Sequence, residues 1–154
     1  MMGNIETTFD IYTLNIGNIL DPVEDKNFWE ATIEVPDILS LCELHLYIQD
    51  IVSFDNDHLY DFYAGRNYRN RKIVFSEESG YPYEGGRYEG IRLKDIYPFK
   101  FKGLKLYYLF DYGDNWIFEI RKSRKRAKPI RDYIYPRVVS SNGIKLIQYQ
   151  DWDL

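Results

Sequence analysis

The chain has 154 residues, 45% of them hydrophobic, so it is long enough for one domain with a buried core and too short for two ordinary domains. No run approaches the roughly 18 apolar residues of a membrane helix, and the amino terminus lacks the apolar core of a signal peptide, so we expect a cytoplasmic protein. The single cysteine, Cys42, excludes an internal disulfide and agrees with a reducing compartment.

Charge is distributed unevenly along the chain. The net charge is -4, yet residues 1–65 hold 13 acidic side chains and one basic, Lys26, whereas residues 66–154 hold 19 basic and 11 acidic. The basic excess is greatest in residues 121–131 (RKSRKRAKPIR), the basic segment, with seven positive charges in eleven residues. Such a segment can bind phosphates, an acidic partner or the acidic half of a second copy, or it can be an ordinary solvated strand end and loop.

The amino-terminal part of the chain predicts two strands. Residues 9–16 and 29–35 each alternate between apolar and polar positions, which is typical of strands with one buried face. Residues 17–27 between them contain Pro22 and several acids, which favours a loop. The 15 Tyr, 9 Phe and 3 Trp of the chain also favour a sheet, because aromatic side chains fit a pleated, half-buried surface.

One main helix is predicted over residues 38–52. Its apolar residues recur at helical spacing: Leu41, Leu44, Ile48, Ile51 and Val52. Pro36 and Asp37 precede it and indicate a turn followed by a helix cap, with Asp37 and Glu43 near the positive end of the helix dipole.

The following residues predict short elements and loops. We expect extended chain at 58–64, a short strand at 73–75, a long loop at 77–90 and a short helical turn at 91–97. The tail from residue 135 to the end carries Tyr149 and Trp152, and we expect it to pack back onto the sheet through these aromatic side chains.

A hairpin near residues 106–120 has a register that its side-chain pattern determines. If residues 112–114 form a three-residue loop, Asp111 faces Asn115, and three apolar pairs share one face: Phe110 with Trp116, Tyr108 with Phe118, and Leu106 with Ile120. A two-residue turn at Gly113 and Asp114 would mix polar and apolar side chains on both faces, so we predict the first register.

Together these elements predict an α+β fold. We expect a single domain over residues 1–154, with an antiparallel sheet or roll of about five or six strands and one main helix, at about 38–52, packed on it.

The order of several short motifs resembles the plasmid pRiA4b ORF-3-like family over residues 10–122. The motifs are Trp29 in a strand, the Leu44-His45 pair in the helix, the segment with Asp57, His58, Leu59 and Phe62, and the hairpin with Phe110, Asp111, Tyr112, Gly113, Asp114 and Trp116. The resemblance implies a bacterial protein associated with plasmids or mobile elements and assigns no reaction. This chain departs from the family pattern at Phe118, where relatives commonly carry His, and it lacks their acidic, glycine-containing tail.

Some members of this family are described as resolvase-like insertion-element passengers. A serine resolvase needs a nucleophilic serine near its amino terminus, surrounded by arginines that hold the phosphodiester. The first 65 residues of this chain contain no Arg. We therefore reject resolvase activity.

The candidate catalytic residues are His45, His58, Asp111 and Asp114, accompanied by Asp57. Histidines and carboxylates serve as general acids and bases or as metal ligands, but they also satisfy backbone groups at helix ends and tight turns. Two His and one Cys fall short of a four-ligand zinc set, so we predict structural roles, no metal and no cofactor.

The candidate nucleic-acid-binding residues all lie in the basic segment: Arg121, Lys122, Arg124, Lys125, Arg126 and Lys128. Aromatic residues of the neighbouring hairpin, such as Tyr112 and Trp116, can stack on bases while these cations hold phosphates. An aromatic stripe on a hairpin also serves as core, and the net acidity disfavours tight binding to a polyanion.

Three hypotheses about function follow. The first is a non-enzymatic binding or accessory module with an unknown protein partner, and no membrane association. The second is nucleic-acid binding through the basic segment, which we expect to project from the end of the last strand into solvent. The third is a small hydrolase that uses His45, His58 and Asp114.

Overall fold

The computed structural model describes residues 8–20, 28–75 and 90–149. These residues form seven strands and two helices, in chain order β1 (Ile11–Leu20), β2 (Trp29–Pro36), α1 (Leu41–Val52), β3 (Tyr60–Gly65), β4 (Ile73–Phe75), α2 (Leu93–Ile96), β5 (Lys105–Phe110), β6 (Trp116–Ala127) and β7 (Arg137–Gly143). The predicted α+β class is confirmed, whereas the predicted number of strands, five or six, was too low. The short helix α2 lies within the helical turn predicted at residues 91–97.

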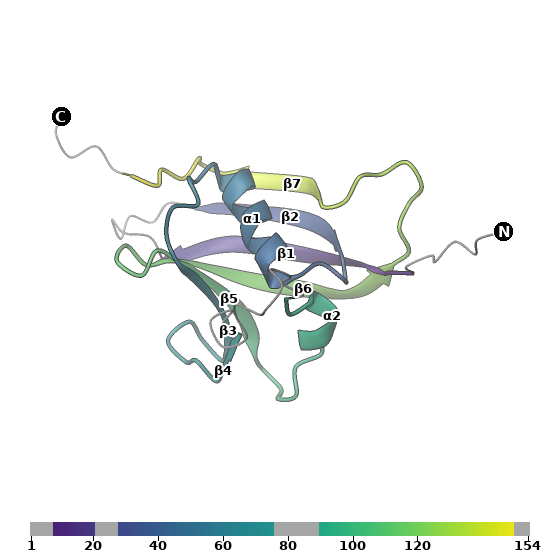
Figure 1. The fold of residues 1–154 in the computed structure, drawn as a ribbon, viewed down its shortest axis with the longest axis horizontal. Helices are drawn as coiled ribbons and strands as arrows, with labels where there is room; N and C mark the ends of the chain where they lie inside the picture. The colour runs from purple at the N-terminus through teal and green to yellow at the C-terminus, as the bar shows by residue number, and fades with distance from the viewer. Residues whose placement is uncertain (1–7, 21–27, 76–89, 150–154) are drawn as a thin grey trace, which may run out of the picture.

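All seven strands belong to one antiparallel sheet. Its spatial order is β4-β3-β5-β6-β1-β2-β7, so β1, the first of the described strands, lies between β6 and β2. Helix α1 crosses one face of the sheet in front of β1 and β2, and α2 lies beside β6 (Figure 1).

The main core lies between this face of the sheet and the helices. Alternate residues of β2, namely Trp29, Ala31, Ile33 and Val35, point into it together with the apolar face of α1. A second, smaller cluster lies on the other face, formed by Tyr63, Tyr107, Leu109 and Ile117. The central strands β3, β5 and β6 are therefore buried on both faces for part of their length.

The hairpin of β5 and β6 has the predicted register. Leu106 pairs with Ile120, Tyr108 with Phe118, and Phe110 with Trp116, and all six side chains belong to the main core. The regular pairing ends at Phe110 and Trp116, and the backbone N–H of Asn115 donates to the carbonyl of Asp111 at 2.6 Å. Asp111 and Asn115 both have positive φ angles, 65° and 57°, which Asp and Asn tolerate better than most residues.

Helix α1 begins at Leu41, three residues later than predicted. Its cap is Ser40 and not the predicted Asp37: the Ser40 hydroxyl accepts from the N–H of Glu43, and the Glu43 carboxylate accepts from the N–H of Ser40. This reciprocal capping box satisfies two N–H groups that the first turn leaves without helical partners. The N–H of Asp37 instead donates to the carbonyl of Asp10, so residues 37–40 form a turn before the helix.

The first strand and the tail differ from their predicted forms. Strand β1 continues to Leu20, into the predicted loop, because Gly17 and Asn18 still pair with β6. Residues 137–143 of the tail form the edge strand β7 on β2, and Leu146 is buried in the main core. The tail therefore packs on the sheet as predicted, but largely through backbone pairing and an aliphatic side chain. Trp152 and nearly all of the predicted loop 77–90 lie outside the described residues.

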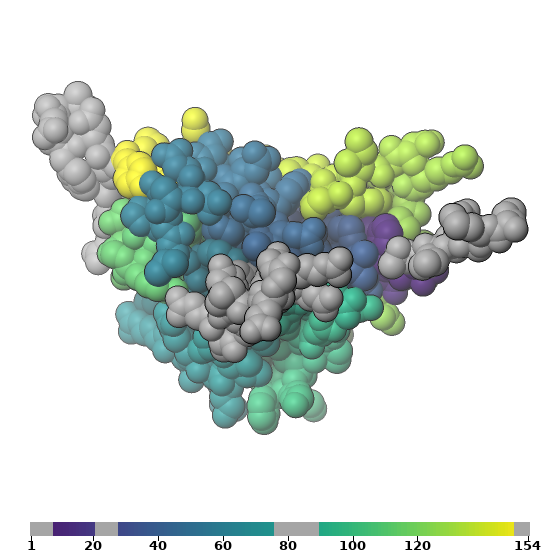
Figure 2. Space-filling view, in the orientation of Figure 1, coloured from purple at the N-terminus to yellow at the C-terminus, as the bar shows by residue number. Residues whose placement is uncertain are grey.

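The basic segment is placed differently from the prediction. Residues 121–127 belong to β6 and pair with β1, from Asn15 with Arg121 to Ile11 with Ala127. Residues 128–131, the rest of the basic segment, are exposed and lie in the connection to β7, which protrudes at the upper right of Figure 2. No helix in the described ranges has the length and apolar character needed to cross a membrane.

Candidate functional site

His45 lies on the inner face of α1 and is 3% exposed. Its Nδ1 atom is 2.5 Å from the hydroxyl of Tyr108, its Nε2 atom is 2.6 Å from Oδ1 of Asn56, and its ring stacks on Tyr60 at 3.6 Å. Gln49 completes the network, donating from Nε2 to the Tyr108 hydroxyl at 2.9 Å and accepting the N–H of Asn56 at 3.0 Å. The imidazole is thus enclosed by aromatic rings and hydrogen-bonded at both nitrogens.

These partners determine the protonation state of His45. Because Oδ1 of Asn56 only accepts, Nε2 of His45 carries the proton, and Nδ1 then accepts from the Tyr108 hydroxyl. Burial lowers the pKa of His45 to about 4, against the opposing effect of the hydrogen bond to Asn56, and burial raises the pKa of Tyr108. At neutral pH this buried network contains no charge.

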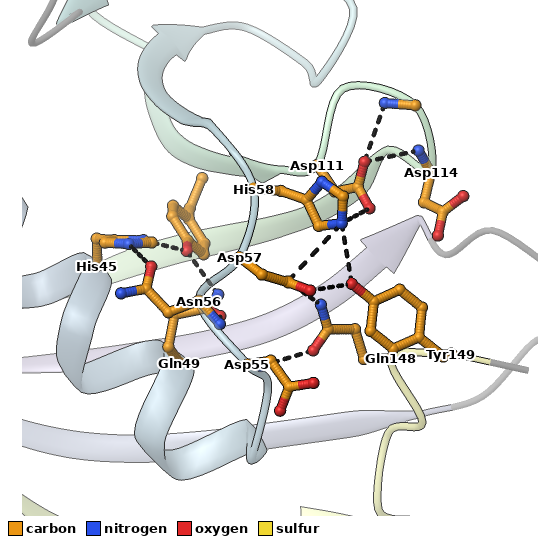
Figure 3. Close-up of polar contacts among 12 residues, drawn as sticks. His45, Gln49, Asp55, Asn56, Asp57, His58, Asp111, Asp114, Gln148 and Tyr149 are labelled. Carbon is orange, nitrogen blue, oxygen red and sulfur yellow. Dashed lines mark hydrogen bonds and ion pairs between the residues drawn. The ribbon is translucent and has the colours of Figure 1, made fainter.

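His58 belongs to a separate and more exposed cluster (Figure 3). Its Nε2 atom lies 2.9 Å from the Tyr149 hydroxyl, 3.3 Å from Oδ2 of Asp111 and 3.7 Å from Oδ1 of Asp57. The Tyr149 hydroxyl also donates to Asp57, which lowers the pKa of Asp57 and raises the pKa of Tyr149 to about 12. Sequence reasoning named His58 and the two aspartates but missed Tyr149, which is 91 residues away from His58.

Gln148 connects the same cluster to the link between α1 and β3. Its Nε2 atom donates to Oδ1 of Asp57 at 2.8 Å, and its Oε1 atom accepts from the N–H of Asp55 at 2.7 Å. Gln148 is buried although it follows the last strand. Together, Gln148 and Tyr149 tie the carboxy-terminal segment to the link between α1 and β3.

The third candidate, Asp114, does not join either histidine. Its backbone N–H donates to Oδ1 of Asp111 at 3.2 Å, as does the N–H of Gly113 at 3.1 Å, and its carboxylate points away from His58 (Figure 3). His45, His58 and Asp114 therefore form no common site. Within residues 8–20, 28–75 and 90–149, no group of three His, Cys, Asp or Glu residues is arranged to hold a metal ion.

The basic segment presents its cations on the outer part of β6 and on the connection that follows it. Arg121, Arg124, Lys125, Arg126 and Lys128 are exposed, and Lys122 is half-buried. Two acids neutralise part of this charge: Glu119 pairs with Arg121 and Lys105, and Asp10 pairs with Lys128 and, at 3.9 Å, with Arg126. In the described part of the chain, Arg124 and Lys125 have no carboxylate partner.

A pocket of about 510 Å³ opens beside these cations. We call it the β6 pocket, and its lining combines cations from β6 with aromatic and apolar residues: Tyr12, Tyr97, Pro98, Phe99, Leu104, Lys105, Leu106, Ile120, Arg121, Lys122, Ser123, Arg124 and Arg126. Lys122 lies over two of the rings, with Nζ 4.4 Å from the centroid of Tyr12 and 5.8 Å from that of Tyr97. Burial among these rings and the nearby charge of Arg126 lower the pKa of Lys122.

The wall of this pocket opposite β6 comes from residues 97–105, which the sequence analysis did not identify as part of a site. Residues 97–105 (YPFKFKGLK) carry Tyr97, Phe99 and Phe101 interleaved with Lys100, Lys102 and Lys105. All three of these lysines are exposed. The alternation of rings and cations is the sequence signal for this wall of the pocket. Of this segment, Tyr97, Phe99 and Lys105 line the pocket, so its rings come from this segment and from Tyr12, and most of its cations come from β6.

Comparison with known proteins assigns the chain to a family. A model of the plasmid pRiA4b ORF-3-like proteins matches residues 23–146. The chain belongs to this family. The match confirms the resemblance and extends through β7 to the buried Leu146. No curated protein matches the chain.

A solved structure has a similar fold. It is a protein of unknown function from Methanosarcina mazei Go1, with a TM-score of 0.63, 20% sequence identity, and coverage of 88% of this chain and 70% of that chain. At this level of identity the likeness concerns the fold alone. Phe118, which stands where the resemblance places a His in relatives, is fully buried and packs edge-on against Trp29 at 6.0 Å.

Proposed function

We propose that this protein is a non-enzymatic binding module that binds nucleic acid through the basic segment of β6. The observation that carries the proposal is that Arg124 and Lys125 are exposed on a strand, without a described carboxylate partner, beside a pocket lined by further cations and aromatic rings. Cations held on a rigid strand can neutralise successive phosphates, and nearby rings offer stacking surfaces for bases.

The net charge of -4 does not oppose this function locally. Several of the acids lie on the other face of the sheet: Glu30 and Glu34 alternate with the buried residues of β2, so they point away from the main core. The β6 pocket opens on the core side, since Tyr12, Leu106 and Ile120 belong to both its lining and the main core. Glu30 and Glu34 thus lie across the sheet from the pocket, whereas Asp10 lies beside it and pairs with Arg126 of its lining.

The hydrolase hypothesis receives no comparable support. His45 is buried and neutral, His58 is tied to Tyr149 and two aspartates, and Asp114 contacts neither. A general base and its partner must lie within hydrogen-bond reach of the same reacting group. An acidic protein surface is the alternative ligand for the same cations. Measuring the binding of oligonucleotides distinguishes between these two ligands.

Fluorescence anisotropy with labelled single-stranded oligonucleotides of about 15 nucleotides tests the proposal, because sites on single strands span roughly 4 to 16 nucleotides per domain. We expect binding at low salt, with a linear fall of log affinity against log salt, since each phosphate contact releases counterions. Replacing Arg124 and Lys125 together by Ala should weaken binding and reduce the steepness of that line by about 0.7 for each lost contact.

The matched control replaces Arg66 and Arg69 by Ala, which removes the same charge from the exposed turn between β3 and β4. We expect this variant to bind nearly as well as the unmodified protein. Equal losses in the two variants would mean that only net charge matters. Absence of binding at low salt would exclude the proposal and leave an acidic protein as the ligand of the basic segment.

A further inference from the structure

The geometry points to the β6 pocket as the place where a single unpaired nucleobase is inserted, so we infer that the protein selects single-stranded over double-stranded nucleic acid. This inference rests on the proposed function and adds the part of the ligand that is recognised. The bases of a duplex are stacked and paired inside the helix, whereas an unpaired base can leave the strand and enter a pocket.

The dimensions of the pocket suit such a ligand. Its volume of about 510 Å³ falls within the roughly 300 to 1,000 Å³ of typical small-molecule sites. Residues 97–106 form one wall, Ile120 to Arg126 of β6 form the other, and Tyr12 of β1 lines it as well. The β6 wall is a strand held by its pairing with β1, and most of the opposite wall is the connection between α2 and β5.

The aromatic residues of the pocket offer surfaces for a base. Tyr97 and Phe99 are half-buried neighbours, with ring centroids 5.0 Å apart and planes inclined by 55°. Tyr97 packs edge-on against the buried Tyr12, with ring centroids 6.1 Å apart. Phe99, which is half-buried, therefore lines the pocket beside a ring that is itself packed. Stacking on such rings is tolerant of sequence because every base has a flat face.

The cations lie where the backbone of an inserted nucleotide would lie. Arg124 and Arg126 line the pocket and are exposed, so they belong both to its rim and to the basic segment that tracks the phosphates. Lys122 is deeper, held over the rings of Tyr12 and Tyr97. A base in the pocket and its phosphate on the rim would thus be bound by one continuous surface.

Two oligonucleotides of equal length and charge test the inference: a normal single strand and a strand in which every base is removed, leaving sugar and phosphate. We expect the normal strand to bind about fivefold or more tightly, the lower end of what stacking one base contributes. The same sequence as a duplex should bind more weakly than the single strand. This comparison uses the unmodified protein.

A variant then assigns the effect to the pocket. Phe99→Leu keeps an apolar side chain and removes the ring, so the advantage of the normal strand should largely disappear while binding of the base-free strand stays the same. Phe101→Leu is the control, since Phe101 is 50% exposed in the same segment and does not line the pocket.

The outcomes separate the two proposals. Equal, salt-dependent binding of the normal strand, the base-free strand and the duplex would overturn the pocket inference and leave the proposed function standing. Equal effects of Phe99→Leu and Phe101→Leu would also overturn it. No binding of any strand at low salt would overturn the proposed function itself.

Discussion

At the scale of single residues, His45 couples the stability of the fold to pH. Its surroundings accept only the neutral ring, because burial among Tyr60, Tyr108 and Phe110 removes the water that would solvate a charge. The pKa of His45 is about 4 in the folded protein and 6.5 without this environment. The unfolded chain therefore binds a proton at a higher pH than the folded chain does.

This difference predicts that stability falls as the pH is lowered from about 6.5 towards 4, since protons then favour the unfolded chain. Over that pH range His45 lowers the free energy of unfolding by an amount on the order of 3 kcal/mol, and above pH 6.5 it causes no such loss. Urea denaturation at pH 7 and pH 4.5 measures it. His45→Gln, which cannot take up a proton, should show a smaller loss of stability between the two pH values than the unmodified protein.

The control for this measurement is Leu46→Ala. Leu46 lies in the same helix, is 49% exposed and carries no titratable group, so its removal should leave the pH dependence of stability as it is in the unmodified protein. If the two variants lose stability to the same extent between pH 7 and 4.5, His45 is not the group responsible.

Asp111 supports the hairpin turn in two ways. It adopts a φ of 65°, and its Oδ1 atom accepts the N–H groups of Gly113 and Asp114. Asn tolerates the same backbone angle and offers the same acceptor, so we expect Asp111→Asn to cost less than about 1 kcal/mol. Asp111→Ala loses both features and should cost about 2 kcal/mol. Comparing denaturant midpoints of the two variants checks this, and similar losses would contradict it.

Which polar residues meet was only partly predictable from the sequence. The turn role of Asp111 follows from the Asp-Tyr-Gly-Asp pattern, because those residue types favour such backbone angles. The separation of His45 from His58 depends on the path of the chain between α1 and β3, and the contact of His58 with Tyr149 depends on where the tail returns. Neither is encoded by local spacing.

At the scale of elements, α1 is held mainly by its apolar face. Leu44 is fully buried against the sheet, so Leu44→Ala should cost on the order of 2 to 5 kcal/mol by loss of burial and formation of a cavity. Leu46→Ala is the matched control in the same helix, because Leu46 is 49% exposed. The free energy of unfolding of Leu46→Ala, measured by urea denaturation, should differ from that of the unmodified protein by less than about 0.5 kcal/mol. An unchanged midpoint for Leu44→Ala would show that this face is not part of the core.

Helices and strands with one apolar face could be predicted from the sequence. Strands whose side chains are almost all exposed could not, because they have no apolar face to recognise. The hairpin of β5 and β6 was predictable because a shift of one residue would mix polar and apolar side chains. Strand β7 has almost every residue exposed, so its side chains show no alternation between an apolar and a polar face. The outer half of β6 is similarly polar, and only its pairing with β1 makes it a strand.

At the scale of the whole molecule, the sheet joins distant parts of the chain. Strand β1 pairs with β2 nearby in sequence, but its other neighbour is β6, where Ile11 meets Ala127, more than a hundred residues away. We predict that a chain ending at Asn115 cannot fold, because β1 and β5 would each lose a neighbour and the main core would lose Trp116, Phe118 and Ile120. A thermal melt without a cooperative transition is the expected result, and a sharp transition would contradict it.

This pairing also bears on how the protein is made. During synthesis β1 leaves the ribosome first, while β6 follows only after roughly a hundred further residues, several seconds later at about 5 to 20 residues per second. Until then, the edge of β1 that will join β6 has unpaired backbone groups and exposed apolar side chains, the conditions under which nascent chains associate. Faster translation should shorten this interval and raise the soluble yield.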